Sequence, residues 1–84
     1  MTNKENLKKS IMYRSTHRGS KEMDILLGQF VKKHISGLSV ADLEDLNEIM
    51  IQDDDLLYDW YFNNISNEKI PSNKITEKLR KFKL

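Results

Sequence analysis

The stretch MDILLGQFVKKH, residues 23–34, decides the fold class, because its apolar residues recur at three- and four-residue spacing. That spacing places them on one face of an α-helix. The stripe comprises Met23, Leu26, Leu27, Phe30, Val31 and His34. Ser20 is suited to cap the helix, and Gly37 is suited to end it in the left-handed conformation. The sequence therefore predicts an amphipathic helix between these two residues.

A first helix is predicted before this stretch, over about residues 4–16, with Thr2 or Asn3 as its cap. Its apolar residues are Leu7, Ile11 and Met12. Gly19 then interrupts the helical pattern before the next helix begins.

Three more helices are predicted after the central stretch. Ser39 opens the third helix, and Asp42 three residues later completes a capping box. The Asp run at residues 53–55 ends that helix and begins the fourth, because Asp favours the positive helix N-terminus. Ser72 is the expected cap of the fifth.

The apolar residues of these helices complete the prediction of a small core. The third helix carries Leu43, Leu46 and Met50, the fourth carries Leu57, Tyr58, Trp60, Tyr61 and Phe62, and the fifth carries Ile75, Leu79 and Phe82. No alternating run typical of a β-strand competes with any of them. We therefore expect an all-α fold, a small five-helix bundle that forms a single helical domain over residues 1–84.

Length and composition restrict the function further. Eighty-four residues suffice for one domain but leave little room for a deep enclosed active site. The chain has no cysteine, which excludes disulfides and thiolate metal sites. No apolar run approaches the roughly 20 residues of a membrane span, and the first ten residues resemble neither a secretory signal nor a transit peptide. We expect a bacterial cytoplasmic protein without direct membrane insertion.

Charge is distributed unevenly along the chain. Residues 1–41 hold eight Lys/Arg and three Asp/Glu, residues 42–59 hold eight Asp/Glu and no Lys/Arg, and the remainder is basic again. A helix-turn-helix would place residues 40–51 in the DNA groove, but that segment carries four acidic and no basic residues. We therefore expect no nucleic-acid partner.

The sequence contains no recognisable catalytic, metal-binding or cofactor-binding constellation. His17 and His34 are far apart and lack the spacing of a zinc site. Residues 53–55 resemble the start of a calcium loop, but Tyr58 stands where that loop needs glycine. The three glycines are too far apart for a phosphate-binding loop. Catalysis by this chain alone is not expected.

The stretch HRGSKEMD, residues 17–24, is the strongest candidate for a binding site. Gly19 suits a helix end, Glu22 and Asp24 favour a helix N-terminus, and Arg18 with Glu22 can form a weak surface pair of about 0.3–0.5 kcal/mol. Glycine also lets another backbone approach, and arginine offers a planar five-donor fork. These four residues therefore either stabilise the junction between two helices or form a polar patch that contacts a protein partner.

The aromatic segment LLYDWYF, residues 56–62, also has two interpretations. Aromatic side chains supply the largest buried areas in small domains, so most of the segment should be core. Consecutive positions nevertheless span more than one helix face, and one or two of Tyr58, Trp60 and Tyr61 should lie at the rim. Tyr58 and Trp60 are therefore further candidates for partner contact.

Arg18-Gly19-x-x-Glu22, extended as HRGSKEMDILLGQF, closely resembles the RGxxE signature of the succinate dehydrogenase assembly factor 2 family, also called the SdhE or flavinator family. The surroundings agree, since MYRSTHRG ends a basic first helix and the acidic DDDLLYDW follows at matching spacing. The resemblance covers almost the whole chain. Two positions depart from it, namely Met23, where the family often has Leu, and Leu56, where Asp is expected.

The resemblance implies a five-helix bundle that binds the flavoprotein subunit of succinate dehydrogenase or fumarate reductase and promotes covalent attachment of FAD. It implies a non-enzymatic helper without a tightly bound cofactor, because FAD belongs to the client. Arg18, Gly19 and Glu22 would contact the client, with Asp24 in support. Two alternatives remain open, namely an interaction module for another partner, such as an antitoxin, and a free flavin carrier.

Overall fold

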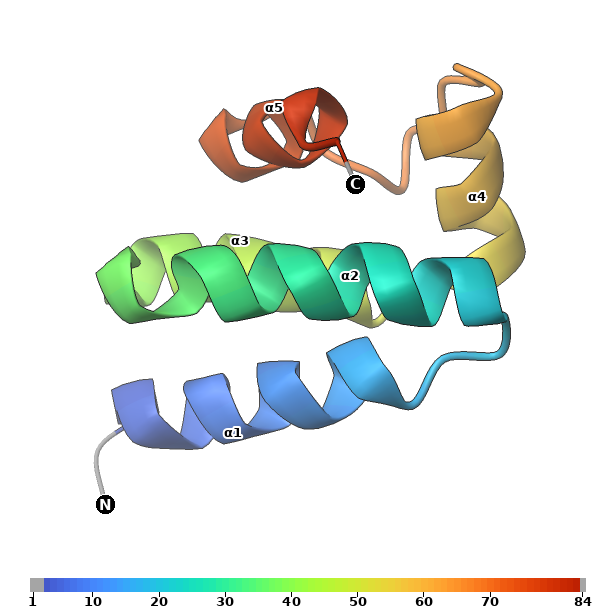
Figure 1. The fold of residues 1–84 in the computed structure, drawn as a ribbon. Helices are drawn as coiled ribbons and strands as arrows, with labels where there is room; N and C mark the ends of the chain where they lie inside the picture. The colour runs from blue at the N-terminus through green and yellow to red at the C-terminus, as the bar shows by residue number, and fades with distance from the viewer. Residues whose placement is uncertain (1–2, 84) are drawn as a thin grey trace.

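A computed structural model describes residues 3–83, which form five α-helices and one short 3-10 helix (Figure 1). The α-helices are α1 (Asn3–Thr16), α2 (Lys21–His34), α3 (Val40–Met50), α4 (Asp54–Phe62) and α5 (Lys74–Lys81), and the 3-10 helix η1 is Ile35–Gly37. These residues contain no strand. The predicted all-α class and the five-helix count are confirmed.

The helices α1, α2 and α3 form the larger part of the molecule, called the three-helix layer below, and α1 lies beside both of the others (Figure 1). α1 packs against both α2 and α3, while α5 packs against α3 on the side opposite α1. α4 follows α3 at one end of this layer and contacts α2. No helix within residues 3–83 is long and apolar enough to cross a membrane.

One apolar core joins all five α-helices. Each contributes at least one side chain that is no more than 1% exposed: Ile11 from α1, Leu27 from α2, Leu46 from α3, Leu57 from α4 and Leu79 from α5. Burial of a Leu or Ile side chain contributes roughly 1.5–3 kcal/mol. The core therefore fixes the helices relative to one another, and with them the ends of the turns that connect them.

The predicted stripe of α2 is confirmed. Its buried residues are Met23, Leu26, Leu27, Phe30 and Val31, and His34 lies half-buried at the end of the helix. In α1, however, the prediction for Met12 is wrong, because this side chain is 54% exposed. Consecutive helical residues point about 100° apart. Ile11 takes the position that faces the core, so Met12 points outward.

The aromatic helix α4 divides between core and rim as expected. Leu57 and Trp60 are buried, Tyr61 is half-buried, and Tyr58 is 40% exposed. The Tyr61 hydroxyl donates a hydrogen bond to the carbonyl oxygen of Phe82, just beyond α5. α4 is thereby tied to the end of the chain.

Several helix starts follow the predicted capping chemistry. The Ser20 hydroxyl accepts a hydrogen bond from the third amide of α2, and Ser39 and Asp42 form the predicted capping box of α3. α1 begins at Asn3, and the alternative cap Thr2 lies outside the described residues. Local sequence therefore determines these helix starts.

Two predicted helix ends are wrong. Asn73, and not Ser72, caps α5, because its side chain accepts a hydrogen bond from the Thr76 amide at 2.9 Å while the Thr76 hydroxyl accepts one from the Asn73 amide at 2.8 Å. Gly37 is not in the left-handed conformation. α2 instead continues into η1, whose tighter turn makes that conformation unnecessary.

Candidate functional site

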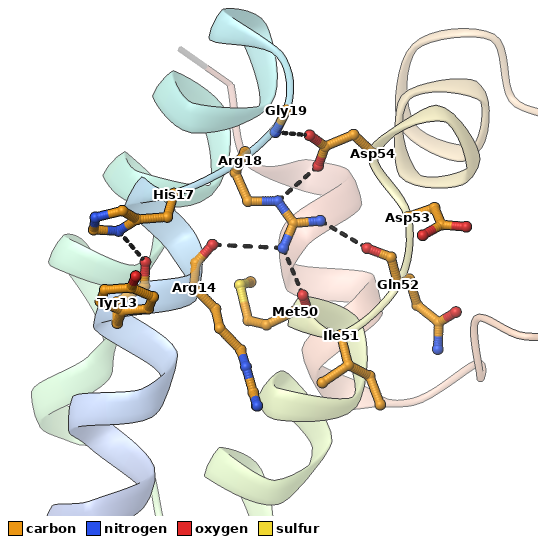
Figure 2. Close-up of a pocket in the computed structure, with 10 residues that line it drawn as sticks. All are labelled: Tyr13, Arg14, His17, Arg18, Gly19, Met50, Ile51, Gln52, Asp53 and Asp54. Atoms are coloured by element: carbon orange, nitrogen blue, oxygen red, sulfur yellow. Dashed lines mark hydrogen bonds and ion pairs between the residues drawn. The ribbon is translucent and has the colours of Figure 1, made fainter.

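The turn between α1 and α2, residues 17–20, lies against the connection between α3 and α4 (Figure 2). This contact brings most of the predicted site residues beside the acidic run at residues 53–55. Arg18 and Asp54, which meet there, are 36 positions apart in the sequence. The site is therefore a product of the tertiary fold.

The Arg18 side chain points into this contact and is only 7% exposed. Its Nε donates to Asp54 Oδ1 at 2.7 Å, and its Nη2 donates to the Gln52 carbonyl oxygen at 2.7 Å. Its Nη1 donates to the carbonyl oxygens of Met50 and Arg14, the latter at 3.5 Å. The guanidinium thus has a paired charge and four hydrogen bonds. Arg18 fastens the α1–α2 turn to the start of α4.

Asp54 also binds the backbone of the same turn. Its Oδ2 accepts hydrogen bonds from the Gly19 amide and from the Ser20 amide, the latter at 3.0 Å. A Cβ atom on Gly19 would lie 2.9 Å from this oxygen, closer than real Cβ atoms approach. A side chain at position 19 would push this carboxylate away from the turn, so glycine favours the contact through its lack of a Cβ atom and not through an unusual dihedral angle.

The two carboxylates of the RGxxE region differ in their surroundings. Asp24 Oδ1 accepts a hydrogen bond from the Arg18 amide at 2.7 Å and so ties α2 to the turn. The Glu22 side chain is exposed, and within residues 3–83 its carboxylate makes no hydrogen bond or ion pair. The predicted surface pair between Arg18 and Glu22 is wrong, because Arg18 pairs with Asp54. The Glu22 carboxylate remains open to a partner.

Beside the turn lies an open groove of about 450 Å³, which we call the turn groove. On one side the His17 ring stacks on Tyr13, with centroids 3.9 Å apart, and its Nδ1 donates to the Tyr13 carbonyl oxygen at 2.8 Å (Figure 2). Ile51, 52% exposed, lies on the other side. The exposed residues Tyr13, His17, Gly19 and Glu22 are called the turn surface below.

The aromatic candidates lie elsewhere on the fold. Trp60 is 6% exposed and packs under the Arg80 guanidinium, whose central carbon lies 4.3 Å from the ring centroid. Tyr58 is more exposed and packs against Phe62, with ring centroids 4.6 Å apart. Partner contact by Tyr58 and Trp60 stays a prediction, and Trp60 offers little surface for it.

The turn surface has the chemistry of protein recognition. It combines a braced backbone turn, an aromatic–imidazole stack and one free carboxylate, which suit a mixed polar and aromatic interface. Within residues 3–83, no three His, Asp or Glu side chains are grouped so that they could hold a metal ion. The turn surface therefore combines a fixed backbone turn with side chains of the kinds that are common in protein interfaces.

Sequence reasoning missed Asp54, the residue that holds the turn together. From the sequence, the run at residues 53–55 is predicted to end one helix and cap the next, and it does not fit a calcium loop. The Asp53 side chain makes no capping hydrogen bond, and no contact between this run and the α1–α2 turn is predicted. The Arg18-Gly19 pair does indicate a nearby carboxylate, because a carboxylate can approach both the arginine side chain and the glycine backbone. Nothing in the local spacing indicates which carboxylate does so.

These features define a small all-α protein with a rigid surface suited to protein recognition. A family model described as "Flavinator of succinate dehydrogenase" matches residues 9–83. The chain belongs to this family, as the RGxxE resemblance predicts.

Named relatives occur in bacteria and in mitochondria. An "FAD assembly factor SdhE" from Acetobacter pasteurianus is 32% identical over 74 residues, which cover 88% of this chain and 65% of that protein. One from Coxiella burnetii is 35% identical over 63 residues, or 75% and 77% of the two chains. A mitochondrial "Succinate dehydrogenase assembly factor 2" from Dictyostelium discoideum is 33% identical over 76 residues, or 90% and 52%.

Several of these relatives are longer than the region of similarity. The matched region spans about half of the Dictyostelium protein and about two thirds of the Acetobacter protein. No solved structure matches the chain.

Proposed function

We propose that this chain is an assembly factor that binds the flavoprotein subunit of succinate dehydrogenase or fumarate reductase and promotes the covalent attachment of FAD to it. Membership of the flavinator family supports this function, as do the printed names of the relatives. The proposed place of action is the bacterial cytoplasm.

One structural observation supports the proposal most directly. Some residues of the RGxxE region hold the shape of the turn, whereas others stay exposed. Arg18, Asp54 and Asp24 bond to one another or to the turn, so they hold its shape. Gly19 and Glu22 remain exposed. A backbone turn that is already held in shape loses little conformational entropy on binding. The turn surface is therefore the proposed contact with the flavoprotein.

The proposed mechanism is positioning. The covalent bond forms between the flavin and a histidine of the flavoprotein, so neither His17 nor His34 takes part in it. A bound helper can hold the flavoprotein so that its own histidine and the flavin stay in reactive geometry. Such positioning can contribute roughly 7–11 kcal/mol to a reaction without any catalytic group on the helper. FAD then belongs to the client, and this chain acts without a tightly bound cofactor of its own.

Flavin fluorescence of the flavoprotein subunit in denaturing gels tests the proposal directly. In cells that lack this chain we expect loss of the covalent flavin signal and its return with the parent chain. Glu22→Ala should fail to restore it, because it removes the free carboxylate of the turn surface. Glu44→Ala, which alters an exposed carboxylate on α3, is the matched control and should restore the signal fully.

The possible results separate the function from the site. An unchanged flavin signal on deletion of the chain would contradict the assembly role itself. Full restoration by Glu22→Ala would leave the role intact and contradict the proposed contact. Both variants should keep the parent's circular dichroism spectrum, since both replaced side chains are exposed.

A further inference from the structure

A second groove, of about 580 Å³, lies between α1 and α2 and is called the α1–α2 groove. Met12, Val31 and Ile35 contribute apolar surface to it, and Tyr13 forms one edge. Met12 is 54% and Tyr13 64% exposed, although both are large side chains that lose favourable burial in this position. The groove is therefore an apolar surface that the chain itself leaves uncovered.

Gly28 forms part of this groove, in the middle of α2. A Cβ atom added there would meet its nearest neighbours, Thr16 Cγ2 and the Ser15 carbonyl oxygen, at 3.8 and 3.9 Å, which is ordinary contact. Its φ is not positive. Glycine destabilises a helix interior relative to alanine, and nothing in this chain requires it here. The space above Gly28 is thus kept open at the expense of helix stability.

The one charged side chain among the residues that line this groove is basic. Lys32 is one of the residues that line it, and Lys8 precedes Met12 by one turn on α1. Residues 1–41, which include both helices, carry eight Lys/Arg and three Asp/Glu. An apolar floor with a lysine beside it is complementary to an apolar stripe flanked by carboxylates.

We propose that the α1–α2 groove binds an amphipathic helix of the flavoprotein subunit, one with small or apolar residues on the buried side and carboxylates beside them. The absence of a side chain at Gly28 lets the backbone of such a helix approach closely. Tyr13 lines both this groove and the turn groove, so one partner can cover both. This inference rests on the proposed function, to which it adds a second contact surface and its chemistry.

Two matched pairs of variants test the groove by binding of the purified flavoprotein subunit. Gly28→Met fills the groove floor, whereas Gly37→Met adds the same side chain where nothing lies within 4 Å. Lys32→Glu reverses a charge in the groove. Lys33→Glu makes the same change on its neighbour, whose Nζ lies 5.8 Å from the centroid of the Phe82 ring.

We expect Gly28→Met and Lys32→Glu to weaken binding about tenfold or more, as for central interface residues. Gly37→Met and Lys33→Glu should bind within about threefold of the parent. In hydrogen exchange, residues 25–35 should gain protection when the flavoprotein subunit is added. A Cβ at position 28 meets its neighbours at ordinary contact distances, and circular dichroism checks that Gly28→Met keeps the fold. Lys32→Glu tests the groove independently, because it reverses a charge without filling the floor.

The outcomes separate this inference from the function on which it rests. If the parent chain does not bind the flavoprotein subunit, the proposed function is contradicted. The proposal that a helix of that subunit occupies the α1–α2 groove is then contradicted as well. If the parent binds and Glu22→Ala weakens binding, but Gly28→Met and Lys32→Glu bind like their controls, the groove proposal alone is overturned. Equal weakening by Lys32→Glu and Lys33→Glu would show general charge attraction and would also contradict it.

Discussion

At the scale of single residues, Asp54 is the group on which the turn depends most. Replacing it with alanine leaves the Arg18 guanidinium, 7% exposed, without its ion pair and removes the acceptor of the Gly19 and Ser20 amides. Breaking a buried pair in this way typically lowers the free energy of unfolding by about 3–5 kcal/mol. We expect Asp54→Ala to fall near the lower value, since Asp54 itself is 16% exposed.

Urea unfolding at neutral pH measures this effect. Asp55→Ala is the control, because Asp55 is exposed, lies beside Asp54 in the first turn of α4, and contributes about 1 kcal/mol or less through the helix dipole. Equal midpoints for the two variants would show that the Arg18–Asp54 contact adds little to stability.

The same residues show which part of the site was predictable from sequence. Arg18, Gly19 and Asp24 lie close together in the chain, so their clustering follows from local spacing, and the structure confirms it. The role of Arg18 could not be predicted in this way. Its ion-pair partner comes 36 positions later, and several carboxylates of the acidic segment could have taken that place. Packing of α4 against α2 decides between them.

At the scale of the elements, helix positions were predictable where a stripe and a cap agreed. In α3, Ser39 and Asp42 define the start through contacts only three residues long, so sequence alone suffices. Gly37 and Ser72 were misassigned because the neighbouring residues compete for the same role. Asn73 offers a better cap than Ser72, with two amides bound to one oxygen, and η1 replaces the glycine turn.

The His34 side chain at the end of α2 packs against Phe82, the residue that follows α5. Its ring packs against Phe30, with centroids 4.7 Å apart, and against Phe82, at 6.2 Å. Burial, followed by the nearby Lys78 and Lys33 charges, lowers the pKa of His34 below its ordinary value of 6.5. Below pH 6.5 the unfolded chain therefore binds a proton more readily than the folded one does.

We expect the free energy of unfolding to fall as the pH drops from 7.5 through 6.5 toward the lower pKa of folded His34. His34→Gln lacks this titration, so its stability should decline less over the same interval. Urea unfolding of both chains at pH 7.5 and 5.5 compares the two slopes, and the titration of Asp and Glu is common to both. Parallel slopes for the two chains would contradict the assignment to His34.

At the scale of the whole molecule, the question is whether α4 and α5 unfold together with the three-helix layer. Figure 1 shows them beyond α1, α2 and α3, where α4 makes its main contact with α2 and α5 makes its main contact with α3. The core nevertheless includes Leu57 and Trp60 of α4 and Leu79 of α5. The Arg18–Asp54 ion pair also joins the start of α4 to the α1–α2 turn. These links favour a single cooperative domain.

Trp60 is the only tryptophan and reports on α4, whereas far-ultraviolet circular dichroism reports on all the helices. We expect the two signals to change at the same urea concentration, with a slope of roughly 1 kcal/mol/M for a chain of this size. A fluorescence midpoint well below that of circular dichroism would mean that α4 unfolds first and that the single-domain prediction is wrong. In Asp54→Ala, which lacks the link between α4 and the α1–α2 turn, any such separation should widen. Coincident midpoints in the parent and their separation in Asp54→Ala would mean that this one ion pair couples α4 to the rest of the fold.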